Sequence, residues 1–207
     1  MPFPELFRDD VFRIETTRLW LRWPRATDAR ALHRFASLAE VAEMTATWPH
    51  PLPEHEADRR ILKARQCNSD GVALVLAIER KKEPGRMIGL PGLHTTGDGV
   101  LGLGFMLDPE FQNRGIMTEA VRAMLDTVLT FAPFASVRGS CRVDNVGSRR
   151  VFEKSGFALL GASLHDAPAR PGPQQCLDFE LSRTAWRSTT AGPQRRLHNV
   201  ASEARAA

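Results

Sequence analysis

The chain of 207 residues contains no tyrosine, only three cysteines and no long apolar run. Cys67, Cys141 and Cys176 lie far apart, form no CxxC pair and have no histidine at zinc-finger spacing. This pattern argues against a disulfide framework and a structural zinc site, so we expect reduced thiols and no metal. No apolar run approaches the ~18–20 residues that span a bilayer, so we expect no membrane contact.

The first ten residues lack the features of a secretory signal. They contain no basic segment followed by an apolar core and a small-residue cleavage site. We therefore expect a cytoplasmic protein.

The composition is that of an ordinary folded domain, with 43% hydrophobic and 25% charged residues. The 28 Lys and Arg residues exceed the 24 Asp and Glu residues by four, and charges of both signs are interleaved. Such a modest excess does not predict nucleic-acid binding. An RNA- or ribosome-binding module would rest on this basic balance alone, and it predicts binding that weakens steeply with salt.

Hydrophobic periodicity predicts alternating strands and helices. Prolines exclude a helix or a central strand over residues 47–54, which we expect to form a stiff loop. We expect strands near residues 14–22, 72–78, 87–90, 100–107, 137–143, 157–163 and 176–181, and helices near 28–36, 54–67, 118–130 and 145–155. This mixture predicts an α/β or α+β domain, of which we expect α+β, with a mainly antiparallel sheet of about six to seven strands and about four helices. The domain should cover residues 14–187, between a leader over 1–13 and a flexible tail over 188–207.

A strand–turn–helix junction over residues 107–120 is the most informative segment. The strand stops before Pro109, a turn containing Gly115 follows, and the most regular helix of the chain begins. Unpaired N–H groups at a helix start, together with the helix dipole, can bind an anion. Gly115 would let a phosphate approach the backbone, and Arg114 could add a charge-assisted contact. An ordinary junction capped near Thr118 would explain the same shape.

A second helix start lies at residues 145–157. Asn145 is a natural N-cap and Ser148 a first-turn residue, which a purely structural account would also explain. As chemistry, Asn145 could hold a ligand amide while the Ser148 hydroxyl acts from the same helix start.

Three segments in this order resemble the GNAT superfamily of N-acetyltransferases, specifically its RimJ/RimL-like branch. They are residues 17–22, the turn over 112–120 and the helix over 145–157. The turn matches the family's Q/R-x-x-G-x-G/A pattern fully at Gln112 and Gly115, whereas Met117 stands where Gly or Ala is usual. The Thr118-Glu119-Ala120 triplet is typical of this branch. The resemblance covers about residues 14–187 and implies a three-layer α/β fold with two strands splayed apart.

The resemblance implies that acetyl-CoA is the co-substrate and a primary amine the acceptor. Asn145 would meet the pantetheine arm, and the arm would lie along a bulged strand edge at Phe105, Met106 and Leu107. The pyrophosphate would lie on the backbone N–H groups of the turn. The implied cofactor-binding residues of this turn are Gln112, Asn113, Arg114, Gly115, Ile116, Met117 and Thr118.

The acid and the base are harder to assign. Many relatives protonate the leaving thiolate with a tyrosine, which this chain lacks, so Ser148 is the best remaining hydrogen-bond donor. Many also carry an acidic residue at the position of Gly102. His94 and Glu110 are the substitutes that we consider, beside a base acting through ordered water. Asp178 and Glu180 share one face of a late strand, where we expect them to be solvated.

The acceptor stays open at this point. It could be a protein N-terminal amine or a small-molecule amine, and the chain could act as a monomer or a homodimer. The proline-rich loop would help to wall the acceptor site, where Trp48 and His50 could grip a substrate. A non-catalytic acyl-CoA-binding regulator with the same fold is the alternative, supported by Met117, Gly102 and the missing tyrosine.

Overall fold

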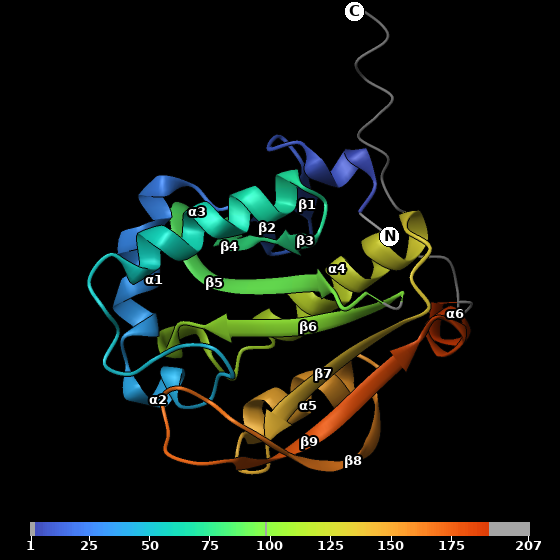
Figure 1. The fold of residues 1–207 in the computed structure, drawn as a ribbon. Coiled ribbons are helices and arrows are strands. Elements are labelled where there is room, and N and C mark those ends of the chain that lie inside the picture. Colours follow the sequence, from blue (N-terminus) through green and yellow to red (C-terminus); the bar gives the residue numbers. More distant parts are fainter. Residues whose placement is uncertain (1–2, 98, 191–207) are drawn as a thin grey trace, which may run out of the picture.

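The computed structural model describes residues 3–97 and 99–190, which fold around one large β-sheet (Figure 1). Its order is β1-β2-β4-β5-β6-β7-β9-β8, and β3 pairs with β5 beside this path. Only β6 and β7 pair in parallel among these strands. The strands are β1 (Arg13–Glu15), β2 (Leu19–Arg22), β3 (Ala73–Val75), β4 (Ala77–Arg80), β5 (Glu83–Thr95), β6 (Val100–Leu107), β7 (Ser136–Arg142), β8 (Ala158–His165) and β9 (Gln174–Ser182).

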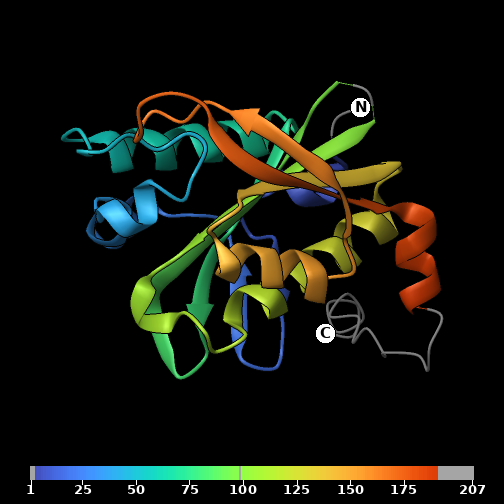
Figure 2. The same cartoon turned by 90° about the horizontal axis from the view of Figure 1, so that it is seen from below.

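Helices cover both faces of the sheet, with α1 and α3 on one face and α4 and α5 on the other (Figures 1 and 2). Two hydrophobic clusters result, one beneath α1 and α3 and a larger one beneath α4 and α5. Within the described residues, no helix combines the length and the apolar content needed to cross a bilayer. The helices are α1 (Ala29–Ala36), α2 (Ala39–Ala42), α3 (Glu56–Ser69), α4 (Ile116–Phe131), α5 (Val146–Lys154) and α6 (Arg183–Thr190), with 3-10 turns η1 (Glu5–Arg8), η2 (Ala26–Asp28) and η3 (Pro109–Phe111).

The α+β class and the mainly antiparallel sheet are confirmed, but the described sheet has nine strands rather than six to seven. Part of the difference lies in residues 72–78, where the expectation of one continuous strand was wrong. The segment breaks at Leu76, whose N–H donates to the carbonyl of Pro91 at 3.0 Å. Pro91 has no N–H to return, so the ladder with β5 is interrupted and β3 and β4 are separate strands.

Both ends of the described chain pack on the domain. Phe3 and Phe7 are buried in the core, so residues 3–13 are part of the fold rather than a separate leader. Helix α6 continues through residues 188–190, where a flexible tail was expected, and Trp186 Nε1 donates to Asp126 at 2.9 Å. Residues 191–207 of that expected tail lie outside the described residues.

Strands β6 and β7 pair over three residues and then part. The paired residues are Val100–Gly102 of β6 and Ser136–Arg138 of β7. Beyond them the Phe152 ring, from α5, packs 5.4 Å from the ring of Phe105 and stacks on Phe179 at 4.9 Å. A β-carbon at Gly139 would lie 2.6 Å from the Phe152 ring, so glycine is needed where this wedge enters.

The splay therefore comes from an aromatic wedge and not from the expected bulge at Phe105–Leu107. The β5–β6 register runs without a shift from Gly89↔Leu107 to Thr95↔Leu101.

We expect Phe152→Ala to lower the free energy of unfolding by about 3–5 kcal/mol, because it removes a buried ring and leaves a cavity. Leu62→Ala is the control, since Leu62 is 70% exposed and its loss should cost little. Chemical denaturation measures both changes. Equal effects of the two substitutions would contradict the wedge.

Candidate active site

The turn before α4 contains two residues in the left-handed backbone conformation. Asn113 has φ +58° and Gly115 has φ +71°, so both adopt the left-handed conformation, which Gly and Asn tolerate best. Gly115 is the N-cap of α4. The first four N–H groups of a helix have no partner within it, and Glu119 N–H is the donor that reaches the Gly115 carbonyl, at 3.0 Å. The first N–H groups of α4 therefore have no partner within the helix, and Gly115 beside them carries no side chain.

Contacts from the β1–β2 turn hold this junction in place. Arg18 donates from Nη1 to the Arg114 carbonyl at 3.0 Å and from Nε to Glu119 at 2.6 Å. Thr16 donates to the same carboxylate at 2.6 Å. Burial alone would raise the pKa of Glu119, but the hydrogen bonds from Thr16 and Arg18 lower it overall. The Glu119 of the Thr-Glu-Ala triplet is thus a structural anchor for the turn.

The departure from the family pattern at Met117 has a packing explanation. Ile116 and Met117 are 4% and 5% exposed and belong to the core under α4. The Met117 side chain is packed in this core, so the methionine in place of Gly or Ala is accommodated by packing. Gln112 donates to the Leu107 carbonyl at 3.3 Å and so ties the turn to the end of β6.

A cleft of about 940 Å³ opens where β6 and β7 part. Phe105 and Met106 line it from the half of β6 that does not pair with β7, and Ser148 and Phe152 line it from α5. Of the other predicted residues, His94 also lines it. Further lining residues discussed below are Trp48, Gly102, Arg138, Ser140, His165 and Asp178.

Ser148 reaches the cleft because Asn145 fixes the start of α5. The Asn145 side-chain oxygen accepts from the Ser148 N–H at 2.9 Å, which makes Asn145 the N-cap. Capping uses the oxygen of this amide and leaves its NH₂ group as a donor toward a ligand. The structure thus brings together the two residues that the second motif singled out.

The His94 imidazole occupies the space above Gly102. The two residues are directly paired across β5 and β6, and a β-carbon at position 102 would overlap the imidazole Nε2. The ring keeps one side exposed, and its partial burial lowers the pKa of His94. An imidazole therefore stands where the resemblance leads one to expect a carboxylate, and it is more readily neutral than an ordinary histidine.

Glu110 and His50 have different surroundings. Glu110 lies in η3, outside the residues that line the cleft, and its carboxylate pairs with Arg86 at 2.6 Å. In the proline-rich loop Trp48 lines the cleft, with the Arg60 guanidinium 4.5 Å from its ring centroid. His50 is exposed and outside the cleft lining.

Sequence reasoning missed several polar groups of the cleft on β7, β8 and β9. Asp178 was expected to be solvated, but it lines the cleft and accepts hydrogen bonds from neighbouring side chains. Glu180 pairs with Arg138 at 2.8 Å. The alternation of Asp178 and Glu180 along β9 shows that they share a face. Only the order of the strands shows that this face is the cleft.

All three cysteines are free, and two of them, Cys141 in β7 and Cys176 in β9, are ill-suited to nucleophilic chemistry. Cys141 and Cys176 are buried, and burial raises the pKa of the Cys141 thiol to about 11. Such a thiol is protonated at neutral pH, and the thiolate is the nucleophilic form.

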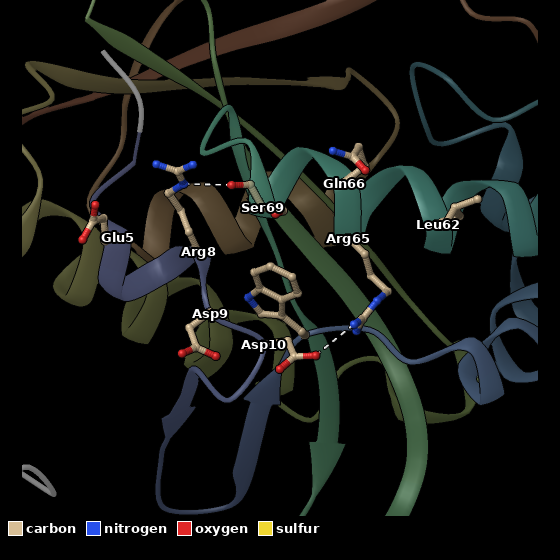
Figure 3. A pocket seen from close by; sticks show the side chains of 9 residues that line it. Glu5, Arg8, Asp9, Asp10, Leu62, Arg65, Gln66 and Ser69 are labelled. Carbon is tan, nitrogen blue, oxygen red and sulfur yellow. Dashed lines mark hydrogen bonds and ion pairs between the residues drawn. The ribbon is translucent and has the colours of Figure 1, made fainter.

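A second hollow, of about 690 Å³, lies between the amino-terminal segment and α3 (Figure 3). Its charged side chains are largely bound locally: Arg65 pairs with Asp10 at 3.0 Å, and Arg8 Nε donates to the Ser69 carbonyl at 2.8 Å. None of the predicted site residues lines this hollow.

Comparisons with known proteins agree with this geometry. A probable N-acetyltransferase, YjcK of Bacillus subtilis (strain 168), is 37% identical over 59 residues, which are 28% of this chain and 33% of that protein. The match thus spans about a third of the relative's length.

Solved structures share the fold at low sequence identity. A GNAT-family acetyltransferase from Bacillus anthracis has a TM-score of 0.72 at 19% identity and covers 84% of this chain and 99% of its own. RimL, described as a ribosomal L7/L12 α-N-protein acetyltransferase and solved with coenzyme A, has a TM-score of 0.73 at 20% identity and covers 83% and 98%. MccE, a microcin C7 self-immunity acetyltransferase solved with acetyl-CoA and AMP, has a TM-score of 0.71 at 19% identity and covers 81% and 93%.

The family described as "Acetyltransferase (GNAT) domain" matches residues 18–158, which include β6, the turn before α4, β7 and α5. The chain therefore belongs to the GNAT acetyltransferase family.

Proposed function

We propose that this protein is an N-acetyltransferase that moves an acetyl group from acetyl-CoA directly to a primary amine. The observation that carries the proposal is the parting of β6 and β7 into a cleft, together with the helix N-terminus of α4, whose preceding turn is bound to the end of β6 through Gln112. The unpaired edge of β6 can accept an extended arm as an added strand. The N–H groups at the start of α4 can bind the pyrophosphate.

The cleft supplies groups for both proton events of the reaction. An amine attacks a thioester only when it is unprotonated, and free alkyl amines have pKa values of about 10. Neutral His94 accepts the ammonium proton, directly or through water, and the free electron pair of the nitrogen then attacks the acetyl carbonyl carbon. The carbon–sulfur bond breaks, the nitrogen gives up its second proton to the departing thiolate, and Ser148 stabilises that thiolate by hydrogen bonding. No step needs a protein thiol, in agreement with the burial of Cys141 and Cys176.

His94 is better supported than Glu110 as the base, because His94 lines the cleft and the Glu110 carboxylate pairs with Arg86 outside it. We further propose that Asn145, Phe105, Met106 and Leu107 contact the pantetheine arm. The turn residues that we propose for the pyrophosphate side are Gln112, Asn113, Arg114, Gly115, Ile116, Met117 and Thr118.

Thiol release from acetyl-CoA tests the proposal. The acceptor panel contains peptides with free N-termini, polyamines and aminoglycosides, and a colorimetric thiol assay follows turnover. We expect release that depends on one of these acceptor classes. Acetyl-CoA that neither binds by calorimetry nor turns over with any acceptor would contradict the proposal.

Ser148→Ala separates chemistry from binding. We expect kcat to fall roughly ten- to a hundredfold, because the leaving thiolate loses a hydrogen-bond donor, while acetyl-CoA affinity stays nearly unchanged. Ser155→Ala is the matched control, since Ser155 ends the same helix outside the cleft lining. A full-rate Ser148→Ala enzyme would remove Ser148 from the mechanism.

A non-catalytic acyl-CoA-binding regulator is the second candidate. Two observations favour it: the chain lacks tyrosine, and Gly102 stands where many relatives carry an acid. It predicts tight acetyl-CoA binding with no acetyl transfer to any amine. The position of His94 above Gly102 favours the enzyme instead.

A further inference from the structure

Three polar side chains of the β8–β9 hairpin form a connected cluster at the cleft. Ser163 Oγ donates to Asp178 Oδ2 at 2.5 Å, and His165 Nε2 lies 3.1 Å from Asp178 Oδ1 and 2.8 Å from Ser163 Oγ. His165 and Asp178 line the cleft, with 42% and 30% of their side chains exposed. The cluster therefore faces the space that an acceptor would enter.

The geometry of this cluster differs from that of a hydrolase triad. In a triad the serine donates to an imidazole nitrogen, and the carboxylate binds the other nitrogen. Here Ser163 donates to the carboxylate, and one nitrogen of His165 contacts both partners. A single Nε2–H tautomer satisfies all three contacts, so Ser163 and His165 hold and orient the Asp178 carboxylate rather than activate Ser163.

The charge of Asp178 is not matched by an arginine or a lysine in the cleft. Among the described residues that line the cleft, Asp178 is the only carboxylate and Arg138 the only arginine or lysine. Arg138 pairs with Glu180 at 2.8 Å. A carboxylate that is partly removed from water, and whose hydrogen-bond partners are a serine hydroxyl and an imidazole, attracts a cation.

Asp178 is too far along the sheet from His94 to bind the same nitrogen. His94 pairs with Gly102, Gly102 with Arg138, and Arg138 with Glu180, so one row crosses four strands. Three strand spacings of about 4.8 Å place the ends of this row roughly 14 Å apart. Asp178 lies two residues beyond Glu180 on the same face, and the two sites therefore contact different parts of one acceptor.

We propose that Asp178, oriented by Ser163 and His165, binds a second cationic group of the acceptor, remote from the amine that is acetylated. The inference rests on the proposed acetyl transfer and narrows its substrates to di- and polyamine-like molecules. The β8–β9 hairpin then determines which acceptor binds, while His94 and Ser148 take part in the acetyl transfer itself.

Calorimetry with the protein saturated by coenzyme A tests this selection. The probes are α,ω-diaminoalkanes and monoalkylamines of the same chain length, which cannot react in this complex. We expect at least one diamine to bind roughly ten- to a hundredfold more tightly than its monoamine, as a charge-assisted hydrogen bond would provide. Asp178→Asn should abolish this preference, and Ser163→Ala should reduce it.

Asp166→Asn is the matched control, since it removes the same charge from an exposed residue of the same hairpin outside the cleft lining. It should keep the diamine preference. An equal ratio of diamine to monoamine affinity in wild type and Asp178→Asn would overturn the inference.

If the protein does not bind coenzyme A, the diamine and monoamine affinities can still be measured by titrating the coenzyme-free protein. Absent coenzyme binding then counts against the proposed function, whereas an absent diamine preference counts against the role of Asp178.

Discussion

Gly115→Glu is expected to abolish measurable acetyl-CoA binding. The substitution places a side chain and a negative charge at the N-cap of α4, where the open N–H groups favour an anion. A loss of at least roughly a hundredfold in affinity follows from repulsion of the pyrophosphate and from obstruction of its approach. Calorimetric titration of acetyl-CoA measures the change.

A control must separate this effect from backbone strain, because Gly115 has φ +71° and any side chain there is strained. Gly85→Glu supplies it: Gly85 has φ +86°, lies near the start of β5, and a β-carbon added there would meet no heavy atom within 4 Å. It adds the same charge and a similar strain away from the turn. Unchanged affinity in folded Gly115→Glu would refute the phosphate site.

His94→Ala is expected to lower kcat by a factor of about 10²–10⁴, the usual contribution of a general base. It should also remove the acidic limb of the pH–rate profile. Partial burial lowers the pKa of His94, so the wild-type rate should fall only when the pH drops below the usual histidine value of about 6.5. Below that lowered pKa the imidazole is protonated and cannot accept the ammonium proton.

A double variant sharpens this test. Gly102→Glu combined with His94→Ala places a carboxylate in the space that the imidazole leaves, because residues 94 and 102 are directly paired. We expect partial recovery of the rate, with an acidic limb near the glutamate pKa of about 4.3. His50→Ala is the control outside the cleft. An unaltered profile in His94→Ala would return the role of base to water or to another side chain.

Much of the fold was readable from local patterns. The helix over 116–131 shows its core face at helical spacing in Val121, Met124 and Val128, and Gly156 ends α5 with φ +87°. The break at Leu76 was not readable, because it depends on Pro91 of another strand. The Phe152 wedge was not readable either, because it is a contact between helix α5 and strands that are distant in the sequence.

The candidate site likewise has some features that local sequence predicts and others that depend on how the strands are arranged. The residues of the turn before α4 are close together in the sequence, and so are Asn145 and Ser148. Their proximity within each segment could therefore be predicted from the sequence. His94 could be named only as one candidate, since its place above Gly102 depends on strand register. Asp178 and His165 were missed because the strand order, not the alternation along β9, places their face on the cleft.

Transfer of a trideuterated acetyl group from acetyl-CoA tests the central claim most directly. Mass spectrometry locates the label after incubation with a diamine and with peptides that carry free N-termini. We expect one labelled acetyl on an acceptor amine and none retained on the protein, because the amine attacks the thioester directly. Label bound covalently to the protein, or acetyl-CoA bound with no label on any amine, would contradict it.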